Sequence, residues 1–115
     1  NLMVFGCWWF LNNPSLIDEI TRMRVELLGT TFVPQHSDAR VLDQLIYKWD
    51  HSRELIARVL IDKYGDLART GWRATEEEIR RDVHQMLHGN IESFVAKVRG
   101  LSAAELKTQV SVTKP

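Results

Sequence analysis

The pattern of apolar and polar residues predicts two buried strands, joined by a helix, at the start of the chain. The run Leu2–Leu11 is apolar on both alternating faces, which is typical of a strand buried on both sides in a parallel sheet. Gly6, inside this run, indicates a bend or a close approach by another group. A second short apolar run, Thr30–Val33, is typical of another buried strand. Since a helix lies between them, a right-handed, parallel βαβ unit is expected.

The connecting helix carries start and stop signals. Pro14 is tolerated in a first helical turn, and Ser15 with Asp18 three residues later resembles a capping box. Gly29 lies where a C-cap glycine is expected. Apolar residues at three- and four-residue spacing give the helix one apolar stripe: Leu16, Ile17, Ile20, Met23, Leu27 and Leu28.

The rest of the chain is predicted to be helical, without further strands. Apolar residues spaced three and four apart predict one long helix over Val41–Arg69, with Gly65 as a weak point. A helix opened by Thr75, with Glu78 as its capping-box partner, is expected to follow and to be stopped by Gly89. Two short helices are predicted after it, the first capped by Asn90 and the second opened by Ser102 with Glu105, before a frayed tail over Val110–Pro115.

Composition and charge narrow the functional classes. The 115 residues suffice for one small domain, and 44% hydrophobic with 26% charged residues is typical of globular proteins. Fifteen basic and fifteen acidic side chains cancel, so neither nucleic acid nor an anionic membrane is an expected partner. No apolar run reaches the ~18 residues needed to span a bilayer. Cys7 is the only cysteine, which excludes an internal disulfide and fits the cytoplasm.

Candidate chemistry gathers where the second strand runs into the long helix. The segment Thr30–Arg40 ends in His36, Ser37, Asp38 and Arg40. Ligands collect at the carboxyl ends of parallel strands, so a site is expected here. Asp38 is a candidate metal ligand or proton shuttle, and Arg40 is suited to grip an anionic or polyhydroxy substrate. The simpler interpretation, left open, is that Ser37 or Asp38 caps the following helix.

Histidines and tryptophans supply weaker candidates. His36 can bind a metal or shuttle protons, although a lone histidine is more often structural. His84 and His88, four residues apart on a helix, can hold a metal. No glutamate follows His84 as in the metalloprotease motif. Two solvated histidines on a helix surface are therefore the simpler interpretation. Trp8 and Trp9 point to opposite faces of a strand, so one can pack in the core while the other lines a sugar site.

Two motifs taken together resemble the uronate (glucuronate) isomerases, which belong to the amidohydrolase superfamily. They are Phe5–Asn12 (Phe-Gly-Cys-Trp-Trp-Phe-Leu-Asn) and, one helix later, Gln35–Arg40 (Gln-His-Ser-Asp-Ala-Arg). The resemblance covers roughly Met3 to Val95. It implies an α/β fold, the C-terminal part of a (β/α)8 TIM barrel, with two parallel strands and their helices followed by an all-helical tail. Residues 1–69 would be the last two βα units, and residues 70–115 a C-terminal helical extension.

The resemblance also implies roles for the candidate site residues. Asp38 would face a divalent metal, with zinc the expected ion, and move a proton between C1 and C2 of the open-chain sugar. Arg40 would contact the oxygens of the substrate, and Trp8, Trp9 and His36 would contribute to substrate binding. The implied reactions interconvert D-glucuronate with D-fructuronate and D-galacturonate with D-tagaturonate.

Much of such an enzyme would lie outside this chain. A barrel takes about 250 residues, and the His-x-His pair that the family carries at its first strand is absent here. We therefore expect a segment of a longer enzyme, inactive alone, whose partners are a uronate and the rest of the barrel; a homo-oligomer is left open. Two other classes are weighed: a non-catalytic α-rich interaction module, and another metal-dependent amidohydrolase, which would keep Asp38 without reason to keep the tryptophan pair.

Overall fold

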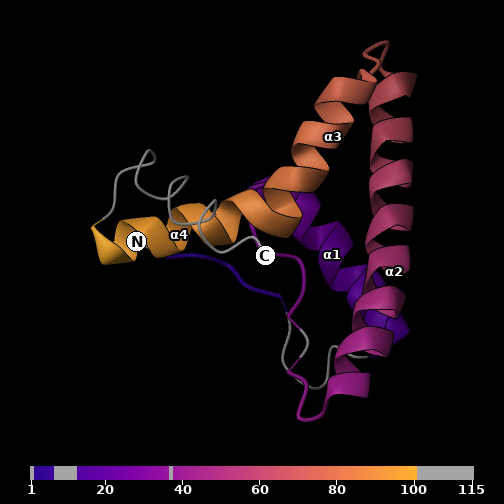
Figure 1. The fold of residues 1–115 in the computed structure, drawn as a ribbon. Coiled ribbons are helices and arrows are strands. Elements are labelled where there is room, and N and C mark those ends of the chain that lie inside the picture. The colour runs from indigo at the N-terminus through magenta and orange to yellow at the C-terminus, as the bar shows by residue number, and fades with distance from the viewer. Residues whose placement is uncertain (1, 7–12, 37, 101–115) are drawn as a thin grey trace.

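The computed structural model describes residues 2–6, 13–36 and 38–100, and its regular secondary structure there is helical (Figure 1). α1 packs against the long α2, and α3 returns from the far end of α2 and runs through a π-helical turn, η2, into α4. The bounds are α1 (Pro14–Leu28), α2 (Leu42–Arg69), α3 (Glu76–His84), η2 (Gln85–Gly89) and α4 (Asn90–Arg99). No helix of the described ranges is both long and apolar enough to cross a membrane.

The expected strand pair of a TIM barrel is not found within these residues. The two extended segments, 2–6 and 30–36, share one isolated parallel bridge between Phe5 and Val33. One backbone hydrogen bond accompanies it, from Val33 N–H to the Val4 carbonyl oxygen at 3.0 Å. The prediction of an α/β barrel portion with two parallel strands is therefore wrong for this structure. A lone strand pair is marginal without further strands. Of these segments, Phe32 is buried among side chains of α2 and η2, whereas Leu2 and Phe5 are exposed.

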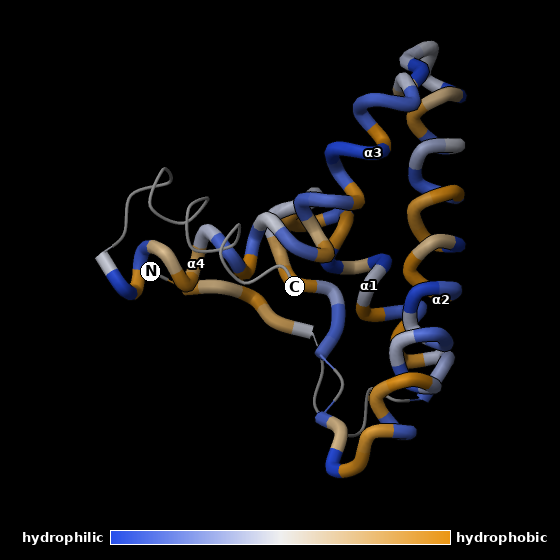
Figure 2. The backbone as a smooth tube through the Cα atoms, in the orientation of Figure 1, coloured by the Kyte–Doolittle hydropathy of each residue, from blue (hydrophilic) through white to orange (hydrophobic). Residues whose placement is uncertain are grey.

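The core lies where the second extended segment meets α2 and η2. The side chains of Phe32 and Met86 are fully buried and pack with Ile56 and Leu60 of α2. Burying side chains of this size contributes about 1.5–3 kcal/mol each. Figure 2 shows hydrophobic and hydrophilic stretches alternating along α2, as expected for a helix with one buried side. Partly buried apolar side chains surround the cluster: Val4, Val25, Leu28, Tyr64 and Val83.

The start of α1 differs from its prediction, whereas its end agrees. Asn13 is the N-cap: its Oδ1 accepts from Ser15 N–H at 3.3 Å and from Ser15 Oγ at 2.9 Å. The capping box predicted for Ser15 and Asp18 is wrong, because Pro14 already occupies the first helical position. Gly29 ends the helix as predicted, at φ 59°, a conformation that favours glycine.

The prediction for α2 and for the start of α3 is confirmed. α2 is continuous over 28 residues, Gly65 included. Thr75 Oγ1 accepts from Glu78 N–H at 3.2 Å, and Thr75 N–H donates to Glu78 Oε2 at 2.8 Å, which completes the predicted capping box.

The predicted stop at Gly89 is wrong. Gly89 is helical, at φ −59°, and η2 passes directly into α4. A Cβ at Gly89 would lie 2.6 Å from Gln85 Oε1, so the glycine makes room for the Gln85 side chain. Asn90 is no cap: its Nδ2 donates to the carbonyl oxygens of Thr30 at 2.6 Å and Phe32 at 2.8 Å. The last predicted helix and the frayed tail fall in residues 101–115, outside the described ranges.

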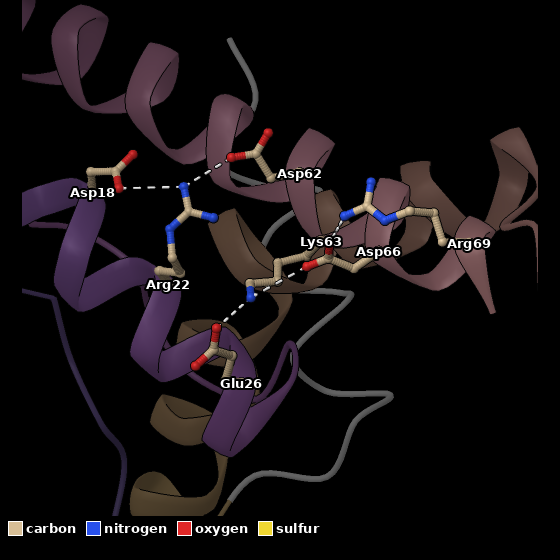
Figure 3. Close-up of polar contacts among 7 residues, drawn as sticks. All are labelled: Asp18, Arg22, Glu26, Asp62, Lys63, Asp66 and Arg69. Carbon is tan, nitrogen blue, oxygen red and sulfur yellow. Dashed lines mark hydrogen bonds and ion pairs between the residues drawn. The ribbon is translucent and has the colours of Figure 1, made fainter.

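Ion pairs join α1 to α2 along their exposed side (Figure 3). Arg22 of α1 lies between Asp18, at 3.4 Å, and Asp62 of α2, at 2.9 Å. The hydrogen bond that Arg22 donates to the Asp62 carboxylate raises the pKa of Arg22. Further along, Lys63 of α2 pairs with Glu26 of α1. Exposed pairs contribute little to stability. These pairs connect α1 and α2 side by side.

Candidate functional site

The candidate site residues lie on the connection between the core and α2. Residues 32–35 are buried, His36 is half-buried, and Asp38 and Arg40 are exposed. Ser37 falls outside the described ranges. The connection therefore has a buried stem that anchors it and an exposed end whose polar side chains a ligand can reach.

Asp38 does not cap the helix that follows it. α2 begins at Leu42, its N-cap is Val41, and no side chain makes a capping hydrogen bond there. The interpretation of Asp38 as a simple cap is therefore wrong, whereas Ser37 lies outside the described ranges. Asp38 has φ 44°, and no other non-glycine residue of the described ranges has a positive φ. This conformation costs on the order of 1 kcal/mol and persists where the surroundings impose it.

Two hydrogen bonds to α2 hold the backbone of this connection. Lys48 Nζ, on a buried side chain of α2, donates to the carbonyl oxygen of Asp38 at 3.4 Å. The backbone N–H of Arg40 donates to Gln44 Oε1 at 3.1 Å. Both bonds use backbone groups of the candidate residues. The Asp38 carboxylate and the Arg40 guanidinium make no hydrogen bond or ion pair with the part of the chain that the structure describes, so they are available to a ligand.

A buried carboxamide, that of Gln35, precedes the exposed residues in the sequence. Gln35 is 2% exposed, and neither its Oε1 nor its Nε2 has a hydrogen-bond partner within the described ranges. Gly6 packs against the same point: a Cβ there would lie 2.3 Å from Gln35 Cα and 2.3 Å from the Pro34 carbonyl oxygen. The close approach predicted at Gly6 is confirmed.

Sequence reasoning missed Lys48 and Gln35. Lys48 carries a readable signal, because it lies four residues before Ser52 and seven before Leu55, on the stripe of α2 that is buried. Gln35 carries no such signal. Its burial depends on the neighbouring segment at Gly6, which is distant in sequence.

The remaining predicted site features are the tryptophan pair and the metal site. Trp8 and Trp9 lie outside the described ranges. Among the residues that the structure describes, no three histidine, cysteine, aspartate or glutamate side chains come together as a metal site. The expected zinc ion, of which this chain would supply Asp38 while the other ligands lie outside it, stays a prediction, and we derive no chemical step through a metal.

Two surface hollows lie away from Asp38 and Arg40. One, of about 510 Å³, is apolar and lies between α2 and α3; the other, of about 540 Å³, lies beside Trp72. Tyr64 borders both, and its hydroxyl donates to Asp82 Oδ2 at 2.8 Å. Burial and this hydrogen bond raise the pKa of Tyr64 well above its usual value, so its phenol is unsuited to proton transfer near neutral pH. The hollows offer no better catalytic candidate than the connection before α2.

Comparison with known proteins decides the family. Neither a family model nor a curated protein matches the chain. The crystal structure of a uronate isomerase from Bacillus halodurans C-125 matches over 96% of the chain, with 58% sequence identity and a TM-score of 0.83. The chain belongs to the uronate isomerase family. The match covers 25% of the Bacillus chain, so our chain spans about a quarter of the length of that protein.

Membership of the uronate isomerase family confirms the resemblance that the motifs at Phe5–Asn12 and Gln35–Arg40 predict. It does not test the individual roles. Those of Asp38, Arg40, His36 and the two tryptophans stay predictions.

Proposed function

We propose that the protein carrying this chain is a uronate isomerase that interconverts D-glucuronate with D-fructuronate and D-galacturonate with D-tagaturonate. The 58% identity to the Bacillus halodurans enzyme, over 96% of the chain, carries the proposal. Because the chain spans about a quarter of that enzyme, the proposed activity belongs to the whole protein. The competing class, a non-catalytic interaction module, gains no support from this match.

Asp38 is the proposed proton carrier. Aldose–ketose interconversion moves a proton between C2 and C1 through an enediol, which requires a base that reaches both carbons. The Asp38 backbone is held by Lys48 at 3.4 Å, while its side chain is exposed and makes no hydrogen bond or ion pair with the described residues. A carboxylate that is fixed at its backbone and open at its side chain suits this task.

Arg40 is the proposed substrate anchor. A uronate carries one carboxylate and several hydroxyl oxygens, and a guanidinium can bind both kinds of oxygen through paired N–H donors. Arg40 lies two residues from Asp38 and is also exposed. We assign the half-buried His36, with Trp8 and Trp9, to the walls of the sugar site.

The decisive experiment is an assay of uronate–ketouronate interconversion by the whole protein, wild type beside Asp38→Asn. The amide keeps the shape of the carboxylate and cannot accept the proton, so kcat should fall by about 10²–10⁴-fold. Asp43→Asn is the matched control, since Asp43 is an exposed carboxylate in the first turn of α2; it should keep activity.

Each contrary outcome refutes a different part of the proposal. Full activity in Asp38→Asn would assign the proton transfer to another residue. A wild-type protein that converts neither glucuronate nor galacturonate would refute the proposed substrates.

A further inference from the structure

His84 and His88 present two imidazole rings side by side at the junction of α3 and η2. Their ring centroids lie 5.5 Å apart and the ring planes are inclined by 34°. Both residues are exposed. Neither ring makes a hydrogen bond or an ion pair with another residue of the described ranges. The proposed isomerase chemistry uses neither histidine.

The backbone beneath this pair is held by tertiary contacts. His88 lies within the π turn, which is closed by the Asn90 N–H donating to the Gln85 carbonyl oxygen. The Asn90 side chain is in turn bonded to the carbonyl oxygens of Thr30 and Phe32 and accepts from Gln85 Nε2 at 2.6 Å. π turns are rare and frequently mark functional sites. Because this one is anchored, little backbone entropy is lost when a ligand bridges the two rings.

The separation of the rings suits one shared metal ion. A metal–imidazole bond is about 2.0–2.1 Å long, so a tetrahedral ion holding two rings keeps their centroids about 5 Å apart. The observed 5.5 Å is close to this value. Neutral imidazole is a good ligand for Ni²⁺, Cu²⁺ and Zn²⁺. No third histidine, cysteine, aspartate or glutamate of the described part joins the pair, so water or an external ligand would fill the other positions.

Nearby positive charges are already compensated. Arg80 and Arg81 lie in the turn that precedes His84. Arg80 pairs with Glu76 at 2.7 Å, and Arg81 pairs with Asp82 at 2.9 Å. These pairs reduce the repulsion that a divalent cation would otherwise meet at this surface.

We propose that His84 and His88 form a two-ligand site for a divalent transition-metal ion, separate from the connection that carries Asp38. The inference is independent of the proposed isomerase activity, because it rests on a different pair of side chains and is tested by binding alone.

Titration of the whole protein with Ni²⁺, followed by isothermal calorimetry, tests the site. The wild type should bind one more Ni²⁺ per chain than the double variant His84→Gln/His88→Gln. Because chelation needs both rings, each single variant should weaken this binding at least about tenfold. His51→Gln is the matched control, because His51 is a half-buried histidine on α2; this variant should bind Ni²⁺ as the wild type does.

Thermal unfolding supplies a second readout that separates binding from misfolding. Both histidines are exposed, so the metal-free variants should unfold at the wild-type temperature, and Ni²⁺ should raise Tm for the wild type more than for the double variant. Equal Ni²⁺ binding by the wild type and the double variant would overturn the proposal. So would single variants that each keep half of the binding, since that outcome describes two solvated histidines acting separately.

Discussion

The Asn90 side chain donates a hydrogen bond from Nδ2 to the carbonyl oxygen of Phe32 at 2.8 Å, across 58 residues of sequence. The same nitrogen donates to the Thr30 carbonyl oxygen at 2.6 Å. These carbonyls belong to the extended segment that a sheet would otherwise satisfy. One buried carboxamide thus takes over part of the role of a neighbouring strand and ties the start of α4 to the stem of the Asp38 connection.

Replacing Asn90 by alanine should therefore destabilise the protein strongly. The change leaves two backbone carbonyls without their partner, at a cost of about 2–3 kcal/mol in the free energy of unfolding. Urea unfolding measures this loss. Ser93→Ala, on an exposed position of α4, is the control and should stay within about 0.5 kcal/mol. An Asn90→Ala loss as small as that of the control would show that water satisfies these carbonyls equally well.

Two glycine-to-alanine changes should have opposite effects. At Gly6 the new Cβ meets backbone atoms at 2.3 Å, which cannot move aside cheaply, so unfolding free energy should fall by about 1–3 kcal/mol. At Gly65, inside α2, a new Cβ would lie 3.9 Å from the flexible end of the Arg69 side chain, and alanine should add about 0.5–1 kcal/mol to the free energy of unfolding. Chemical denaturation of both variants checks the pair. Equal effects of one sign would contradict the close approach at Gly6.

Gln35→Met should leave the fold intact and raise its stability by about 1 kcal/mol. The carboxamide is buried without a partner in the described ranges, and an apolar side chain of similar shape removes that desolvation cost. Differential scanning calorimetry of the variant measures the change. A clear loss of stability would mean that the carboxamide is bonded to a group outside those ranges. Gln35→Glu is the opposing control, since it buries a carboxylate and should destabilise.

Lys48→Met should reduce catalysis more than it reduces stability. The substitution keeps the apolar stem on the inner side of α2 and removes the donor that holds the Asp38 carbonyl oxygen at 3.4 Å. A displaced proton carrier should lower kcat about tenfold, with little change in KM. Steady-state kinetics of the whole protein measure both constants. Lys48→Arg should recover part of kcat. A rise in KM with kcat unchanged would instead assign Lys48 to substrate binding.

Local sequence signals suffice where a residue's neighbours along the chain decide its conformation. The span of α2, the capping box at Thr75 and the C-cap at Gly29 all follow from side chains within one or two turns. The close approach at Gly6 is readable for a related reason, because glycine in an apolar run leaves room that some other group fills. The two paired motifs were also enough to indicate the uronate isomerase family.

Contacts between distant segments decided the rest. Within the described ranges the apolar runs pair at one bridge only, and Phe32 is buried against α2 and η2 and not within a sheet. Gly89 continues a helix that local rules would end, since Asn90 is bonded to a segment some sixty residues away. The position of Asp38 likewise depends on α2. The helix begins only at Leu42, which leaves Asp38 outside it, and Lys48 of α2 holds the Asp38 backbone. Burial and long-range hydrogen bonds set these features, and neither is encoded in the spacing of neighbouring residues.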